Sequence, residues 1–232
     1  MKLIQKDYSQ QGNWIGTNEK AQLLPLIAES FCDVDAKVYF DKYFSDTNAF
    51  DRKLRLYFAH EKVVGYCLLT LHKQHGVILV RASAAFFPEY RQGGNTFDFS
   101  LSQVAKLKLR HPFTSIYYAD TMLSPAMYRA MAKHVAIVYP SNDMPTETES
   151  LFKQFNPQGL FSAYAQRTCL VDAGRKTNYS ETEIAQFKNN NKKEIAYYCH
   201  ANPDFDKGIA LFVIMPITCW QFIATAIKRF KS

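Results

Sequence analysis

The 232-residue sequence predicts an α/β fold, with a mixed central sheet flanked by helices and a C-terminal α/β extension. Apolar runs of strand length alternate with segments whose apolar residues recur every three or four positions. Hydrophobic residues make up 47% of the chain and aromatic residues 15%, which is enough for a sizeable core. Turn-forming residues separate most of these runs, so strands and helices are expected to alternate along the chain.

The first elements follow from short patterns. Residues 2–8 are expected to form a strand. Asn18 can cap a helix that continues to about Phe31, because the apolar residues of this segment fall on one face. A second helix is expected over residues 35–44, where aromatic and apolar residues gather.

Three strands are expected next, over residues 54–59, 63–71 and 77–87. The polar triplet 60–62 would turn the first of them back along the second as a hairpin, and Gly65 can mark a bulge. Pro88 ends the third strand, since a proline cannot keep donating to a sheet ladder.

A glycine-bearing loop follows that third strand and leads into a helix expected to reach about Arg110. Backbone N–H groups at a helix N-terminus suit a phosphate or pyrophosphate, and glycine lets the main chain come close to the anion. Asn95 or Thr96 can cap this helix. The candidate pyrophosphate-binding residues are Arg91, Gln92, Gly93, Gly94, Asn95 and Thr96.

The spacing Arg91-x-x-Gly94-x-Thr96 resembles the acyl-CoA-binding loop of the GNAT superfamily of N-acyltransferases, which runs Gln/Arg-x-x-Gly-x-Gly/Ala. Arg91 and Gly94 match, whereas Thr96 stands where a small residue is usual. The resemblance implies a GNAT-like acyl-CoA-binding core over residues 1–134. Residues 135–232 would then be an extension that completes the same domain. It also implies acetyl-CoA, or another acyl-CoA, as co-substrate.

Acyl transfer to an amine needs a group that holds the thioester carbonyl, a base and an acid. In the GNAT family, backbone N–H groups of the fourth strand hold the acyl carbonyl, and the resemblance puts them around Ala84, Ala85 and Phe86. Asp120 follows the strand expected over residues 115–119. It is the candidate base, because ligands of open α/β sheets gather at such strand ends. Its alternative role is that of a turn aspartate.

The candidate acid lies on the next helix, which Ser124 is expected to cap and Pro125 to begin. The family often has a tyrosine on this helix that protonates the leaving thiolate. Aligning Ser124 with the family's usual asparagine makes it a cofactor-binding candidate and puts Met131 at the position of the acid. Tyr128 lies three residues earlier, on nearly the same face, and is the remaining candidate. Its alternative role is that of a core tyrosine with a satisfied hydroxyl.

The C-terminal third offers weaker patterns, and no clear linker separates it, so a single extended domain is preferred. Strands are expected over residues 135–139, 168–172 and 195–199. Helices are expected over residues 146–155 and 181–188.

The uncharged run 209–227 is close to the length of about 20 residues that a membrane span needs. Polar residues dilute it, however, and lysines flank both of its ends. Pro216 fits a boundary between a strand over 209–215 and a helix over 217–230. We therefore prefer a central strand and an amphipathic helix to a span. A homodimer interface, or contact of residues 209–231 with a membrane surface, stays open.

The net charge of +7 suits anionic partners, although no basic tract stands out and clusters such as residues 52–55 are expected on the surface. No zinc-finger spacing or RNA-binding signature occurs, so no nucleic-acid partner is expected. Five scattered cysteines without C-x-x-C, and histidines without ligand spacing, predict neither a disulfide scaffold nor a metal site. The N-terminus lacks a signal-peptide core, which favours a cytoplasmic location.

These observations favour direct transfer of an acetyl or other acyl group from acyl-CoA to a primary amine of a small molecule or peptide. No G-x-S-x-G elbow or cysteine nucleophile motif indicates covalent catalysis. Two alternatives stay open. The first is a synthase of long-chain N-acyl amino acids or acyl-homoserine lactones that uses an acyl carrier protein. The second is a CoA-binding regulatory module without turnover, which the missing tyrosine and Thr96 favour.

Overall fold

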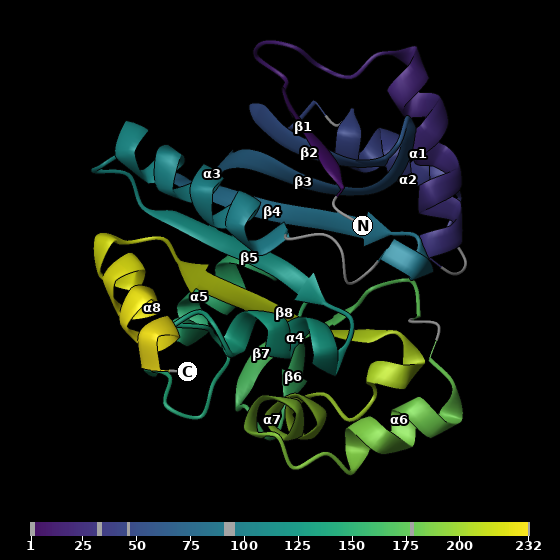
Figure 1. Ribbon diagram of the computed structural model, residues 1–232. Helices are drawn as coiled ribbons and strands as arrows, with labels where there is room; N and C mark the ends of the chain where they lie inside the picture. Colours follow the sequence, from purple (N-terminus) through teal and green to yellow (C-terminus); the bar gives the residue numbers. More distant parts are fainter. Residues whose placement is uncertain (1–2, 32–33, 46, 91–95, 177–178, 232) are drawn as a thin grey trace. The chain divides into compact units, whose positions relative to one another are not determined.

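The computed structural model describes residues 3–31, 34–45, 47–90, 96–176 and 179–231 (Figure 1). The chain forms two compact units, Met1–Ile116 and Tyr117–Ser232. Within the described residues, each unit contains a four-stranded antiparallel sheet with flanking helices, which confirms the α/β class. The division lies after Ile116, whereas the sequence pattern put a boundary near residue 134. That residues 135–232 complete the same domain stays a prediction.

The first unit has strands in the order β1-β2-β3-β4, each antiparallel to its neighbour. Each strand therefore pairs with the next one along the chain, and short hairpins join β2 to β3 and β3 to β4. Its elements are β1 (Ile4–Ser9), α1 (Thr17–Ser30), α2 (Ala36–Phe44), β2 (Asp51–Ala59), β3 (Lys62–Gln74), β4 (Val77–Phe86), a short 3-10 helix (Pro88–Tyr90) and α3 (Thr96–Arg110).

Helices cover both faces of this sheet because neighbouring residues of a strand point to opposite sides. The ring of Tyr66 in β3 lies 5.3 Å from that of Phe44 in α2. The sulfur of Cys67, the next residue, lies 3.6 Å from the Ser100 hydroxyl in α3. Both faces are therefore buried, and this explains why β3 reads as a nearly continuous apolar run.

The predicted bulge in the β2–β3 hairpin is confirmed. The register between β2 and β3 shifts by one residue between Tyr57 and Phe58, so that Gly65 faces Tyr57 and Val63 faces Phe58. Gly65 also faces Phe86 of β4, and a Cβ atom at residue 65 would overlap the Phe86 ring. Glycine is needed here for space and not for an unusual backbone angle.

The second unit has the strand order β5-β8-β7-β6, so the last strand of the chain lies inside the sheet. Its elements are β5 (Ile116–Met122), α4 (Pro125–Ala132), α5 (Thr148–Phe155), β6 (Leu160–Ser162), β7 (Arg167–Asp172), α6 (Glu181–Lys188), α7 (Lys193–Ala201), a 3-10 helix (Phe205–Lys207), β8 (Ile209–Pro216) and α8 (Cys219–Lys231).

Two strand predictions in the second unit are wrong. Residues 195–199 belong to α7 and not to a strand, and the buried pairs Ile195/Tyr198 and Tyr197/Ala201 show the helical spacing that the aromatic content hid. Residues 135–139 form no strand beyond a single bridge at Tyr139.

Helix α1 begins at Thr17 and not after Asn18. The backbone N–H of Gly16 donates to the Glu19 carboxylate at 3.0 Å, so the acidic side chain of the first turn closes the helix end.

The run 209–227 divides as predicted into a strand and a helix, β8 and α8. The helix begins two residues later than expected, because the Thr218 hydroxyl accepts the backbone N–H of Gln221 at 3.0 Å and caps it. In the part of the chain that the structure describes, no helix is long and apolar enough to cross a bilayer.

Candidate functional site

The strand predicted before the glycine-bearing loop and the helix predicted after it are both present. Strand β4 ends at Phe86, a 3-10 turn occupies Pro88–Tyr90, and α3 begins at Thr96. The loop candidates themselves lie outside the described residues, and they are Arg91, Gln92, Gly93, Gly94 and Asn95. The structure therefore fixes where this loop leaves the sheet and where it meets the helix.

The start of α3 is the positive end of a 15-residue helix. Thr96 is its first helical residue and hence does not cap it, so Asn95 is left as the candidate cap. Asp98 lies exposed in the first turn and places a carboxylate at the same end. An anion bound here would meet the helix dipole together with this negative charge.

The register of β4 distinguishes between the three backbone candidates for holding an acyl carbonyl. The N–H of Phe87 donates to the Val64 carbonyl at 3.1 Å, and hydrogen-bonding direction alternates along an antiparallel strand. The N–H of Ala85 therefore points toward β3, whereas those of Ala84 and Phe86 point toward the other edge of β4.

A second hydrogen bond agrees with this alternation of N–H directions along β4. The N–H of Ile78, an even-numbered residue of β4 like Ala84 and Phe86, donates away from β3 to the Ser115 carbonyl at 3.0 Å. Ala84 is exposed, whereas Phe86 is buried. Ala84 and Phe86 are thus the residues of this trio whose N–H groups point away from β3.

Next to these residues lies a cluster of hydroxyls that the sequence did not indicate. The Ser83 hydroxyl lies 2.6 Å from that of Tyr39 in α2 and 2.9 Å from that of Tyr66 in β3. Both tyrosines are buried. The three groups are far apart in sequence, so no spacing could show their contact. A connected set of hydroxyls can pass a proton as well as fix side chains.

Asp120 lies within β5 and not beyond it, because the strand continues to Met122. One carboxylate oxygen of Asp120 accepts the Tyr118 hydroxyl at 3.1 Å, and the other accepts the Thr121 N–H at 2.8 Å. The carboxylate is half-buried and accepts both of these donors.

Ser124 caps α4 as predicted, with its hydroxyl oxygen accepting the Met127 N–H at 3.3 Å. Tyr128 is buried on the same helix, and its hydroxyl donates to the Pro140 carbonyl at 2.9 Å. Burial raises the pKa of Tyr128, and the Glu194 carboxylate adds to the rise. This hydroxyl thus holds its proton firmly and already has an acceptor within the second unit.

Replacing Tyr128 by phenylalanine is expected to lower the stability of the second unit by about 1–2 kcal/mol, because the Pro140 carbonyl loses its donor. Urea unfolding followed through Trp220 in a Trp14→Phe background measures this loss, since Trp14 lies in the other unit. The same variant tests catalysis. A fall in kcat of tenfold or more in protein that remains folded would assign Tyr128 as the acid, whereas an unchanged kcat would leave it a structural role.

The second unit also contains a cavity of about 480 Å³ between α4, α7, α8 and the segment 135–145. Tyr128 and Tyr197 form part of its wall, and Lys193 and Glu194 bring opposite charges to it. Tyr197 is only 6% exposed, and no described residue is a hydrogen-bond partner of its hydroxyl.

Three cysteines are held as thiols by their surroundings. Burial raises the pKa of Cys67 and that of Cys169 to about 12, and that of Cys199 to about 11. A thiol must ionise to act as a nucleophile, so these positions are unsuited to carrying an acyl group. Direct transfer to the amine needs no such residue.

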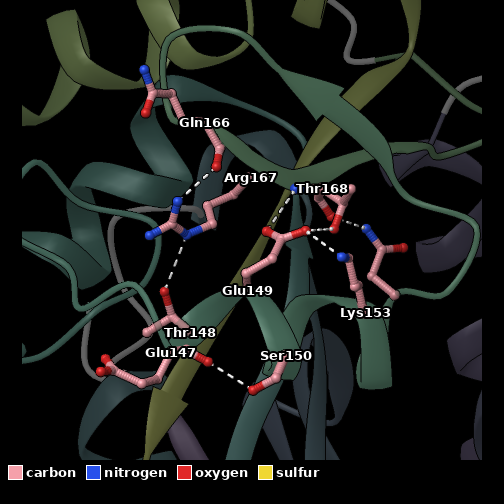
Figure 2. A network of polar contacts seen from close by, with 9 residues as sticks. Glu147, Thr148, Glu149, Ser150, Lys153, Gln166, Arg167 and Thr168 are labelled. Carbon is pink, nitrogen blue, oxygen red and sulfur yellow. Dashed lines mark hydrogen bonds and ion pairs between the residues drawn. The ribbon is translucent and has the colours of Figure 1, made fainter.

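A polar network in the second unit fastens α5 to β7 (Figure 2). The Arg167 guanidinium donates to the Thr148 hydroxyl at 3.3 Å, and the Glu149 carboxylate accepts the Thr168 hydroxyl at 3.2 Å. Lys153 lies 3.8 Å from Glu149 on the next turn. These groups satisfy one another, so the network is a structural tie and not a candidate site.

The candidates thus fall into two groups by unit. Ala84, Ala85, Phe86 and Thr96 belong to the first unit, and Asp120, Ser124 and Tyr128 belong to the second. Sequence reasoning found the β4–α3 unit and the α4 cap from local signals. It missed the Ser83 hydroxyl cluster and the Tyr197 cavity.

No protein-family model matches the sequence, and no curated protein matches it either. The GNAT family N-acetyltransferase YhbS from Escherichia coli, solved in complex with CoA, aligns over 56% of this chain and 68% of its own at 15% identity, with a TM-score of 0.39. An acyl-CoA N-acyltransferase from Pseudomonas aeruginosa aligns over 62% and 95% at 16% identity, with a TM-score of 0.38.

A conserved protein from Enterococcus faecalis aligns over 58% of this chain but only 33% of its own, at 15% identity and a TM-score of 0.39. TM-scores below 0.5 at such low identity carry no inference about activity.

Proposed function

We propose that this chain is a GNAT-type N-acyltransferase that moves an acetyl or other acyl group directly from acyl-CoA to a primary amine of a small molecule or peptide. The observation that carries the proposal is the β4–loop–α3 unit. The N–H groups of Ala84 and Phe86 at the edge of β4 are donors for a thioester carbonyl. The motif Arg91-x-x-Gly94 follows a few residues further along the chain. Together with the start of α3, it would supply donors for a pyrophosphate.

In this proposal the amine nitrogen attacks the thioester carbon, so that a C–N bond forms as the C–S bond breaks. The N–H groups of Ala84 and Phe86 hold the carbonyl oxygen as it becomes negative. The candidate for taking the proton of the ammonium is Asp120, and the candidate for protonating the leaving thiolate is Tyr128, both in the second unit. The Ser83–Tyr39–Tyr66 hydroxyls offer a second route for a proton in the first unit.

Calorimetric titration of the purified chain with acetyl-CoA tests the cofactor site. We expect micromolar binding by the wild type, and a loss of tenfold or more for Arg91→Ala, which removes a charged donor. For Gly94→Trp we expect no binding, because a bulky side chain would block the approach of the main chain to the anion.

Arg110→Ala is the matched control for this titration. It removes the same charge from the far end of α3, about 21 Å from the first helical residue, and should leave the affinity unchanged. Failure of the folded wild type to bind either acetyl-CoA or CoA would overturn the proposal.

One observation favours a second candidate, a CoA-binding regulatory module without turnover. The hydroxyl of the candidate acid Tyr128 is buried and bonded to Pro140, and the second unit has its own ligand-sized cavity. Chromatography that measures the release of CoA in the presence of a panel of amines distinguishes the two functions. Binding of acetyl-CoA without release for any amine would favour the module, and transfer from long-chain donors alone would favour the synthase alternative.

A further inference from the structure

Helix α8 exposes a row of large apolar side chains. Trp220 is 63% exposed and Phe230 is 92% exposed, with Ile223 and Ile227 about half exposed between them. Their spacing of three or four residues puts all four on one side of the helix. We call these four residues the α8 stripe. In a helix that packs on a core, such a row faces inward.

The inward face of α8 is polar. Gln221 is only 3% exposed, and its amide accepts the Ile137 N–H at 3.1 Å and donates to the Ile137 carbonyl at 2.8 Å. The buried Thr225 hydroxyl accepts the Ala136 N–H at 3.2 Å. The Lys228 ammonium donates to the carbonyls of residues 132 and 135.

These two faces reverse the usual arrangement of an amphipathic helix. The polar contacts of Gln221, Thr225 and Lys228 satisfy backbone groups of the segment 132–137, so this orientation of α8 is well defined. The α8 stripe is then left in water, at a cost that scales with its apolar area. A contiguous apolar patch of this kind usually marks an interaction surface.

Positive charge gathers on α8 and on the segment 131–138 that its inward face contacts. Burial lowers the pKa of His134, and the nearby cations Lys133, Arg229, Arg129 and Lys228 lower it further. Neither α8 nor the segment 131–138 contains a carboxylate in its sequence. Glu194, in α7, is a carboxylate that acts on Lys228. The helix that carries the stripe and the segment behind it are therefore basic.

We propose that the α8 stripe docks on a lipid bilayer with anionic headgroups, so that α8 lies in the plane of the membrane surface. Its apolar side chains would enter the boundary between headgroups and acyl chains, where tryptophan is favoured. The positive charge of α8 and of the segment behind it would attract the anionic headgroups. This inference does not depend on the proposed transferase activity.

Two features favour a membrane over a second copy of this chain. The exposed parts of the four side chains amount to roughly 500 Å², less than the about 800 Å² per partner that a stable interface buries. A symmetric dimer through this face would also bring its basic residues close to their copies, and such like charges repel. An anionic bilayer has the complementary charge, and binding to it does not require a minimum area of contact between two protein surfaces.

Cosedimentation of the full chain with vesicles tests this proposal. We expect binding to phosphatidylcholine vesicles that contain about 30% phosphatidylserine, with much weaker binding to phosphatidylcholine alone and a decrease at high salt. The double variant Trp220→Ser/Phe230→Ser should bind at least tenfold more weakly. Leu109→Ser/Phe113→Ser, which changes two residues of the first unit that are 81% and 100% exposed, is the matched control and should bind like the wild type.

A spectroscopic readout identifies the contacting face. In a Trp14→Phe background Trp220 is the sole tryptophan, and its emission should shift to the blue on vesicle addition and be quenched by brominated lipid. Failure to bind anionic vesicles, an equal loss in the control variant, or Trp220 emission unaffected by vesicles would overturn the proposal. So would a dimer that the Trp220→Ser/Phe230→Ser variant abolishes, since the stripe would then be an interface between copies.

Discussion

Replacing Gly65 by alanine is expected to destabilise the first unit by about 2–3 kcal/mol and to slow acyl transfer ten- to a hundredfold. The new Cβ atom would overlap the ring of Phe86 across the β3–β4 pair, at ring atoms close to the main chain. The ring cannot simply rotate away, because it packs against Tyr57 at a centroid distance of 4.9 Å. The strand itself must shift, and with it the Phe86 N–H that we propose holds the acyl carbonyl.

Gly159→Ala is the matched control for this prediction. A Cβ atom at residue 159 would overlap Asn156 and the Thr168 carbonyl, so a comparable loss of stability is expected in the second unit. It should leave acetyl-CoA affinity and the first unit unchanged. The double variant Gly65→Ala/Phe86→Ala removes the overlap, and a measured coupling near zero between the two substitutions would contradict the argument.

Arg52→Met should cost the first unit about 3 kcal/mol of unfolding free energy, since two hydrogen bonds from a buried charged group are lost. Arg52 is 1% exposed. Its Nε donates to the Tyr43 carbonyl at 3.1 Å and its Nη1 donates to the Gln10 side chain at 2.8 Å. The guanidinium therefore ties β2 to the end of α2 and to the chain beyond β1. Methionine keeps an unbranched, apolar side chain, although a shorter one, and donates nothing.

Urea unfolding of a Trp220→Phe background, in which Trp14 reports on the first unit alone, measures this loss. Arg81→Met changes an exposed arginine of β4 and should alter stability by less than about 0.5 kcal/mol. Arg52→Lys keeps the charge without the planar fork, and we expect it to recover only part of the loss. Equal midpoints for Arg52→Met and Arg81→Met would show that the buried guanidinium contributes nothing.

The sequence predicted elements whose signals are local. The β2–β3 hairpin, the β4–loop–α3 unit, the serine cap of α4 and the division of 209–227 all depend on residues within a few positions of one another. Helix α7 was missed because five residues with two tyrosines fit a strand as well as a helix. Only the partners of those side chains decide between the two.

The features that escaped prediction depend on long-range contact. Arg52 belongs to a basic cluster expected on the surface, yet its side chain is buried and donates to the Gln10 side chain and the Tyr43 carbonyl. Ser83 meets hydroxyls from 17 and 44 residues away. The orientation of α8 is set by backbone groups of residues 132–137, more than 80 positions earlier. Composition and spacing carry no information about such partners.

The central place of β8 has a consequence for synthesis on the ribosome. Strand β8 pairs with both β5 and β7, yet it is the last strand to be made. β5 must therefore wait for about 90 further residues before its partner emerges, and closing so long a loop is slow. During that interval β5 and β7 expose unpaired edges that can join other chains. The first unit, whose strands pair in order, can fold before this delay begins.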